Sequence, residues 1–166
     1  MLLFISNFAQ MQYMKIIPLT KGMETLVDDE DFERFGHLKW HFTTAGYAAR
    51  RPWCPINKKA KGSVYLHREI CQTPKGLHTD HVNGVRLDNR KENLRVCNPS
   101  QNQGNEKLSK NNTTGYRGVI FSFGKYRAQI KVNYKTRVVG AYDTAQQAYE
   151  KYKEMAVKAW GEFARV

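Results

Sequence analysis

The last third of the chain carries the sequence pattern that most constrains the fold. Three short runs combine β-branched and aromatic residues and are separated by turn-type residues: 116–121, 126–132 and 136–141. Thr144 and Gln147 then form a capping box that opens a helix, and Gly161 follows as its stop signal. Six residues share one face of this helix: Ala145, Ala148, Tyr149, Tyr152, Ala156 and Ala159. The pattern predicts a three-stranded antiparallel sheet packed on one helix over residues 115–166.

Shorter elements are predicted upstream. Residues 15–20 and 24–27 flank a Lys21-Gly22 turn, which indicates two short strands. The acidic run 28–31 opens a short helix, because carboxylates cap the free amides of a helix N-terminus and complement its dipole. We expect no metal site in that run, since no partner ligands follow it. An exposed basic loop is predicted at 58–63.

Composition indicates the domain boundaries. Residues 1–13 have no clear periodicity and are interpreted as a tail. Residues 104–114 contain two lysines near the pair Asn111-Asn112, which is typical of a linker. The predicted class is α+β. Its expected organisation is a tail at 1–13, a domain with a β-rich N-terminal subregion at 14–103, a linker at 104–114 and a second domain at 115–166.

An excess of basic residues indicates a polyanionic partner. The 166 residues include 27 Lys and Arg against 15 Asp and Glu, a formal net charge of +12. Six acidic residues cluster in 24–33 without a base among them, so the remaining chain is more basic still. This distribution favours nucleic acid over an acidic protein or a membrane surface, because no basic amphipathic helix stands out.

The N-terminal sequence predicts neither export nor membrane insertion. The apolar run at 1–5 ends at Ser6, far short of the roughly 18 residues of a membrane span, and no basic segment precedes it. Cys54, Cys71 and Cys97 form no CxxC pair, so we expect reduced thiols. The expected location is the cytoplasm of a bacterial or phage-infected cell, without secretion and without a membrane partner.

Four polar residues supply the parts that metal-assisted phosphodiester hydrolysis needs. Asp80 directly precedes His81, and Asn93 and Asn102 follow 12 and 21 residues after the histidine. One carboxylate and one amide oxygen suit a hard divalent cation and leave positions for water and phosphate, which favours magnesium over zinc. An imidazole that titrates near neutral pH can take a proton from the attacking water. Neighbouring strand residues face opposite sides, so Asp80 and His81 can serve the metal and the water separately.

These residues, with Val-Tyr-Leu-His-Arg at 64–68, resemble the HNH nuclease motif of phage and intron homing endonucleases. The resemblance implies that Asp80 and Asn102 ligate the metal and that His81 is the general base. It also implies that Asn93 holds the catalytic loop and orients His81 through a backbone contact. Asn102 stands where many HNH proteins carry histidine, which shifts the preference further toward magnesium or manganese.

The same resemblance implies a ββα-metal fold. Asp80 and His81 would lie on its first strand, residues 94–97 on its second strand and residues 99–107 on its helix. His67 and His78 lie near the motif, and we interpret both as packing or phosphate-contact residues rather than metal ligands.

The C-terminal pattern resembles the Apetala/ethylene-response-factor DNA-binding domain. The shared sequences are Tyr-Arg-Gly-Val at 116–119, Gly-Lys-Tyr-Arg at 124–127 and Gly-Ala-Tyr-Asp at 140–143. In that family the sheet lies in the major groove, which here implies these DNA contacts: Arg117, Phe123, Lys125, Arg127, Gln129, Lys131 and Arg137. Ile120 and Ser122 stand where the plant factors usually carry arginines, so their target sequence does not carry over. The alternative is an ordinary basic surface.

The leading hypothesis is a metal-dependent DNA endonuclease of the homing type that uses magnesium, or manganese, on double-stranded DNA. One such site in a monomer would nick one strand, whereas a double-strand break would need a homodimer or two events. A non-catalytic, sequence-specific DNA-binding regulator is the alternative from another class. An RNA-binding module is a third hypothesis, although the aromatic RNP-type signature is missing.

Overall fold

The computed structural model describes residues 14–54, 59–60 and 62–166. It divides them into two compact units. The first comprises the described residues up to Thr73 together with Val85–Arg95, and the second comprises Pro74–Gly84 together with Val96–Val166. The predicted tail at 1–13 lies outside the described residues. Among the described residues no helix is long and apolar enough to cross a membrane.

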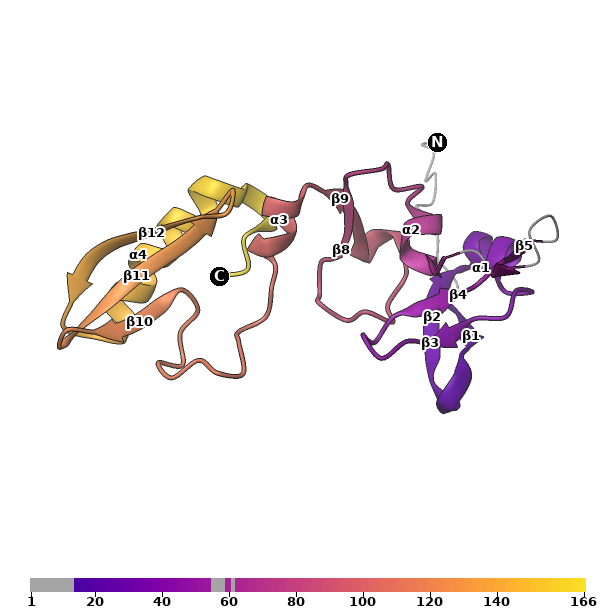
Figure 1. The fold of residues 1–166 in the computed structure, drawn as a ribbon, viewed down its shortest axis with the longest axis horizontal. Helices are drawn as coiled ribbons and strands as arrows, with labels where there is room; N and C mark the ends of the chain where they lie inside the picture. Colours follow the sequence, from indigo (N-terminus) through magenta and orange to yellow (C-terminus); the bar gives the residue numbers. More distant parts are fainter. Residues whose placement is uncertain (1–13, 55–58, 61) are drawn as a thin grey trace, which may run out of the picture. The chain divides into compact units, whose positions relative to one another are not determined.

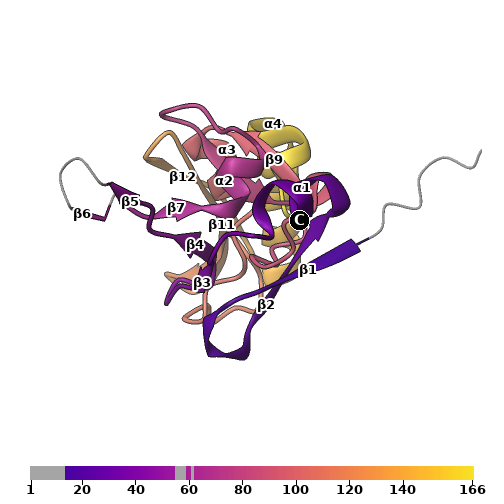
Figure 2. The same ribbon diagram turned by 90° about the vertical axis from the view of Figure 1, so that its right-hand side faces the viewer.

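The first unit begins with a hairpin. Strands β1 (Met14–Pro18) and β2 (Glu24–Asp28) pair antiparallel around the 3-10 turn η1 (Thr20–Gly22), with Ile16 opposite Leu26. Figure 2 shows this hairpin at the lower edge of the view. The hairpin predicted at these residues is therefore confirmed.

Short elements complete the first unit. They are α1 (Asp29–Phe35), β3 (His41–Phe42), β4 (Ala48–Arg50), β5 (Trp53–Cys54), β6 (Lys59–Ala60), β7 (Val64–Tyr65), α2 (Leu66–Ile70) and the 3-10 turn η2 (Lys91–Asn93). The order β3-β4-β7 forms one sheet, and β5 pairs with β6. The loop predicted at 58–63 is therefore wrong in part, because its residues 59–60 pair as a strand. One core holds the unit together: Ile17, Leu19, Val27, Phe35, Trp40, Ala48, Leu66, Ile70 and Leu94.

The acidic run opens α1 as predicted, but its first carboxylate does not cap the helix. Asp29, Glu30 and Asp31 lie in the first turn, where the helix dipole favours negative charge. Asp28 occupies the N-cap position, yet its Oδ2 accepts a hydrogen bond from the backbone N–H of Lys91 at 2.7 Å. The carboxylate thus ties β2 to the segment 85–95 of the same unit.

The second unit starts with two strands and a helix in the predicted order. Strand β8 (His78–His81) pairs with β9 (Leu94–Cys97), and α3 (Pro99–Gly104) follows. The boundary between the compact units passes through β9. The helix predicted at 99–107 ends three residues early, because Asn105 leaves the helical conformation as the C-cap.

The C-terminal sheet and helix form as predicted. Strands β10 (Val119–Ser122), β11 (Lys125–Val132) and β12 (Lys135–Tyr142) make one antiparallel sheet, and α4 (Ala145–Trp160) covers one face before the turn η3 (Gly161–Phe163). Figure 1 shows α4 lying along this sheet. Thr144 and Gln147 form the capping box in both directions. The core between the layers contains Ala128, Ile130, Tyr152, Ala156 and Trp160.

Two details of this module differ from prediction. The first strand begins at Val119 rather than at residue 116, because Gly118 adopts a φ of +67° beneath the ring of Tyr152. On α4, Ala159 is exposed and Trp160 is buried in its place. The buried series Ala148, Tyr152, Ala156 and Trp160 is spaced by four residues, so the helix packs along a single row.

The segment predicted as a linker lies inside the second compact unit. Strand β8 and helix α3 before residues 104–114, and the sheet β10–β12 after them, belong to the same compact unit. Residues 104–114 therefore do not mark a boundary between compact units. Composition favours a flexible segment there, whereas side chains from distant positions bind its beginning, as described below. The boundary at 104–114 stays a prediction about independently folding domains.

Candidate catalytic site

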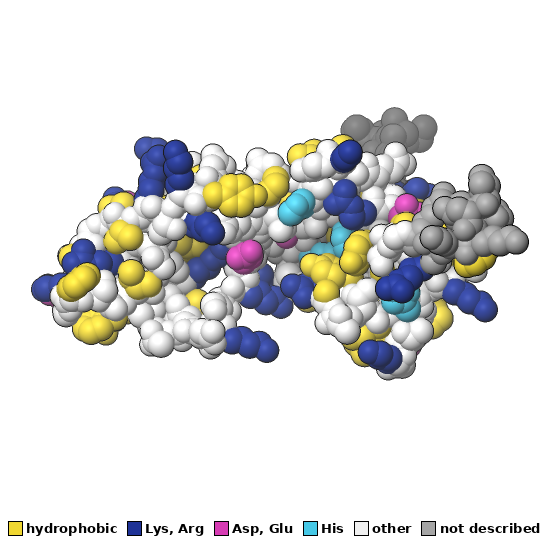
Figure 3. Space-filling model, in the orientation of Figure 1, with side chains coloured by type: hydrophobic (Ala, Val, Ile, Leu, Met, Phe, Trp, Pro, Cys, Tyr) yellow, Lys and Arg dark blue, Asp and Glu magenta, His cyan; other side chains and the backbone are white. Residues whose placement is uncertain are grey.

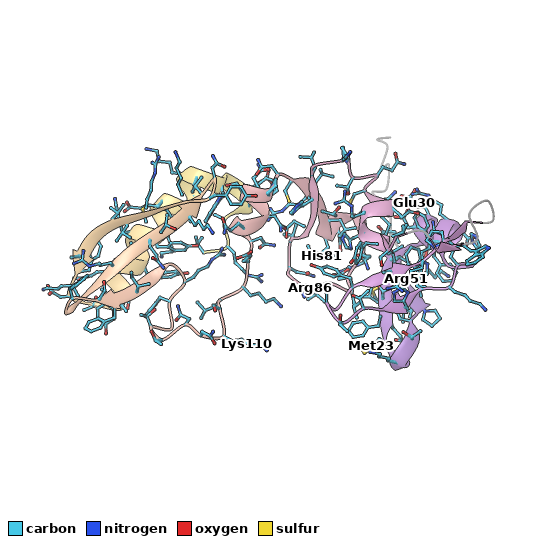
Figure 4. The ribbon with its side chains drawn as sticks, in the orientation of Figure 1. Met23, Glu30, Arg51, His81, Arg86 and Lys110 are labelled. Atoms are coloured by element: carbon cyan, nitrogen blue, oxygen red, sulfur yellow. The ribbon has the colours of Figure 1, made fainter. Side chains whose placement is uncertain are left out.

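Asp80 and His81 end strand β8 and are both buried. Their side chains are 7% and 5% exposed. Asp80 and His81 follow each other on a strand, so they face opposite sides, as the sequence predicted. The sharp turn after β8 is closed by the backbone N–H of Gly84, which donates to the carbonyl of His81 at 2.8 Å. Figure 4 labels His81 at this position.

Asn105 binds both residues, and the sequence reasoning missed it. Its Nδ2 donates to Asp80 Oδ1 at 2.9 Å and to the carbonyl oxygen of His81 at 2.8 Å. The side chain is 8% exposed, so its amide is a fixed part of the site. Eight asparagines lie between Gly76 and Asn112, and nothing in the local pattern distinguishes Asn105 from the others.

Asn102 lies on α3 in the same compact unit. The helix starts cleanly because Asn98 and Gln101 form a capping box and Pro99 occupies the first turn. Asn102 Oδ1 lies 4.0 Å from Cys97 Sγ, which makes only a weak contact. Cys97 is buried. In the first unit, burial raises the pKa of the Cys71 thiol to about 11.

A cavity of about 420 Å³ opens beside Asn102. His78, Lys131 and Tyr134 lie in its wall, together with Glu106, which is the one carboxylate among the lining residues. Tyr134 is 85% exposed at the turn between β11 and β12. The cavity therefore places a cation and an aromatic ring beside the predicted metal ligand.

Asn93 lies in the first unit and stabilises the loop that precedes β9. Its Nδ2 donates to the carbonyl of Asp88 at 2.7 Å, and the side chain is buried. Asp88 in turn accepts two hydrogen bonds from Arg90, and these bonds raise the pKa of the guanidinium. Asn93 thus stabilises the loop that precedes β9, while its predicted roles in holding the catalytic loop and orienting His81 stay predictions.

His67 packs in the first unit. Its ring centroid lies 5.0 Å from that of Tyr47 and 5.6 Å from that of Tyr65, and its side chain is buried. Packing against aromatic rings is one of the two roles predicted for it. His78 is exposed and lines the cavity beside Asn102.

The sheet residues predicted to bind DNA divide into several locations. Arg127, Gln129 and Lys131 alternate with the buried Ala128 and Ile130, so they face away from α4. Two further predicted DNA contacts lie at the start of β11. Phe123, in the turn before this strand, is 94% exposed, and Lys125, its first residue, pairs with Asp143. Figure 3 shows basic and exposed hydrophobic side chains interspersed over this part of the molecule.

Arg117 and Arg137 lie elsewhere. Arg137 is directly opposite Ile130 in the register of β11 and β12, so it belongs to the α4 side of the sheet. Arg117 donates to the carbonyl oxygens of Gly104 at 2.8 Å and Gln103 at 2.6 Å. Its guanidinium is therefore engaged at the end of α3. Neither position could be recognised from strand alternation, because both depend on tertiary pairing.

The donor groups present fit a hard divalent cation. No group of three His, Cys, Asp or Glu residues that could hold a metal occurs in the described part of the chain. One carboxylate with one amide oxygen is an all-oxygen donor set, which suits a hard divalent cation. Asp80 is buried with Asn105 fixing one of its oxygens, which orients the carboxylate.

Residues 64–103 match the protein-family model described as HNH endonuclease. The matched segment runs from β7 to α3 and contains Asp80, His81, Asn93 and Asn102. The chain therefore contains an HNH endonuclease domain, and the predicted enzyme class is confirmed. The match ends at residue 103, so the resemblance of the C-terminal sheet to the Apetala-type domain stays a prediction.

Two viral proteins are similar to this chain. An uncharacterized HNH endonuclease of Acanthamoeba polyphaga mimivirus is 28% identical over 158 residues, which cover 92% of this chain and 79% of that protein. Protein 3.8 of Escherichia phage T7 is 41% identical over 49 residues, which cover 30% of this chain and 40% of that protein. No solved structure matches the chain.

Proposed function

We propose that the chain is a magnesium-dependent DNA endonuclease of the homing type that nicks duplex DNA. One observation carries the proposal: the HNH-matched segment places Asp80 and His81 together at the end of β8, with Asn102 on the helix of the same compact unit. Asp80 and Asn102 would hold one divalent ion. Asn93 would hold the catalytic loop.

His81 is the proposed general base. A nitrogen of its imidazole takes a proton from water while the water oxygen forms a bond to the scissile phosphorus. The bond from phosphorus to the 3′ oxygen breaks, and that oxygen takes a proton from solvent water, which leaves a 5′-phosphate and a 3′-hydroxyl. A divalent ion supplies positive charge to the phosphate oxygens and the departing 3′ oxygen when it is bound. Burial of Asp80 and His81 limits their motion, which favours a fixed geometry.

The face of the sheet that carries Arg127, Gln129 and Lys131 is the proposed DNA-binding surface. Two arguments support it: the resemblance to the Apetala-type domain and the positive charge on the side away from α4. The cavity beside Asn102 connects this surface with the metal ligand, since Lys131 lies in its wall. Lys131 can neutralise a phosphate there. We leave Arg117 and Arg137 out of the surface.

The metal requirement gives the first test. Supercoiled plasmid incubated with the purified protein should be nicked in magnesium and left intact when EDTA removes the metal. Asp80→Asn should raise the magnesium concentration needed for half-maximal nicking at least tenfold, because a neutral amide binds a divalent ion less well than a carboxylate. Glu33→Gln, which also replaces a carboxylate by an amide, is the matched control, because Glu33 is exposed in the first unit and outside the matched HNH residues. Nicking that persists in EDTA would contradict the proposal.

A pair of arginine variants tests the DNA-binding face. Arg127→Ala should weaken duplex binding. It should also reduce the slope of log affinity against log salt concentration by about 1, which corresponds to the loss of one phosphate contact. Arg137→Ala should change both quantities much less, because its side chain belongs to the opposite side of the sheet. Fluorescence anisotropy across a salt series measures both. Equal effects of the two variants would mean that DNA does not distinguish the two faces.

A further inference from the structure

The end of helix α3 is bound by two arginines from distant positions. The last carbonyl groups of a helix have no partners within it. Arg117 Nη1 donates to Gly104 O at 2.8 Å and Arg117 Nη2 to Gln103 O at 2.6 Å. The backbone N–H of Arg165 donates to Gly104 O at 2.9 Å. Positive charge at this end of the helix also complements the helix dipole.

The guanidinium of Arg165 contacts both the residue after α3 and the turn after His81. Its Nη1 donates to Asn105 O at 3.4 Å and its Nη2 to Asn83 O at 3.2 Å. The approach to the turn is close, since a Cβ added at Gly84 would lie 2.6 Å from Arg165 Nη1. The planar guanidinium of Arg165 therefore joins Asn105, which binds Asp80, to the turn that follows His81.

Packing of α4 on α3 supports this arrangement. A Cβ added at Gly104 would lie 2.9 Å from the Trp160 ring, so only glycine allows the helices to approach this closely. Trp160 Nε1 also donates to Ser100 Oγ at 3.3 Å. The segment that carries Arg165 is thus held against α3 independently of the guanidinium contacts.

We infer that Arg165 is a positioning residue for the catalytic turn 81–84: it fixes Asn105 and Asn83 and thereby the orientation of Asp80 and His81. The inference rests on the proposed nuclease function and adds to it. The segment after α4, outside the matched HNH residues, would complete the catalytic site rather than only deliver it to DNA. An error of about 1 Å in such a site can lower a rate by about 10²-fold.

Arg165→Ala in the full chain tests the inference, with Lys158→Ala as the control that removes one exposed positive charge from α4. The single-turnover nicking rate on saturated plasmid should fall about 10-fold to 100-fold, while the Kd for duplex DNA should change about as little as in the control. Amide hydrogen exchange of Gly84, measured on free protein, should become faster, because this N–H closes the turn onto His81.

Arg165→Lys keeps the charge but lacks the planar fork that reaches the carbonyl groups of Asn105 and Asn83 together, so its nicking rate should be intermediate. It also serves if Arg165→Ala fails to fold. Unchanged nicking together with unchanged Gly84 exchange would overturn the inference. A wild-type protein that does not nick DNA would instead contradict the proposed function, and Gly84 exchange would then still decide whether Arg165 holds the turn.

Discussion

His81→Ala should lower the plasmid nicking rate by about 10²-fold to 10⁴-fold, because the variant lacks the proposed general base. The affinity for duplex DNA should be retained, since the proposed binding surface lies on the sheet β10–β12. The measurement is a single-turnover nicking assay in saturating magnesium, combined with a binding titration in EDTA. Loss of rate at unchanged affinity is the expected signature of a general base.

The matched control for this prediction is His37→Ala. His37 is exposed in the first unit and outside the matched HNH segment, so its removal should leave the rate unchanged. If His81→Ala nicks as fast as the wild type, His81 is not the base. If the wild type and His37→Ala both bind DNA but neither nicks it, the chain is better described as a non-catalytic DNA-binding regulator.

Gly118→Ala should destabilise the protein more than Gly115→Ala, although both glycines have a positive φ. A Cβ at Gly118 would lie 2.0 Å from the Tyr152 ring, whereas a Cβ at Gly115 would meet nothing within 4 Å. Both substitutions carry the cost of the backbone conformation, and only the first adds a clash in the core. The expected difference in the free energy of unfolding is about 1–3 kcal/mol.

Urea denaturation of the two variants, followed by tryptophan fluorescence, measures this difference. Trp160 belongs to the same core as Tyr152, so its emission reports on the affected layer. Equal destabilisation by both substitutions would show that Tyr152 moves aside without cost. In that case the late start of β10 would have a cause other than the packing of Gly118.

Much of the local structure was predictable because it depends on neighbours in the sequence. Thr144 and Gln147 specify the start of α4, and the alternation of Ala128 and Ile130 with polar residues specifies which side of β11 is buried. The pair Asp80-His81 was recognisable for the same reason, since the two residues are adjacent in the sequence and on strand β8, while their catalytic roles stay predictions. The end of α3 was missed because Asn105 is one of many asparagines and its partners are distant.

Two of the predicted DNA contacts lie at positions that depend on pairing between separate segments of the chain. Strand register placed Arg137 opposite Ile130 on the α4 side, and this register runs unbroken from the turn at residues 133–134. Arg117 matched a DNA-contact position in the resembling family, but here it binds the carbonyl groups of α3. Unpartnered carbonyls at a helix end attract such a cation wherever the chain brings it near.

The sequence by itself determined the elements and the chemistry: a strand with Asp80 and His81, a helix with Asn102, and a basic sheet on an alanine-lined helix. Periodicity, capping and residue type are local properties, so a single sequence carries them. Only the tertiary structure decided how the site is held. Asn105 and Arg165 reach the catalytic turn from 24 and 82 residues away, and contacts over such separations depend on the packing of the whole unit.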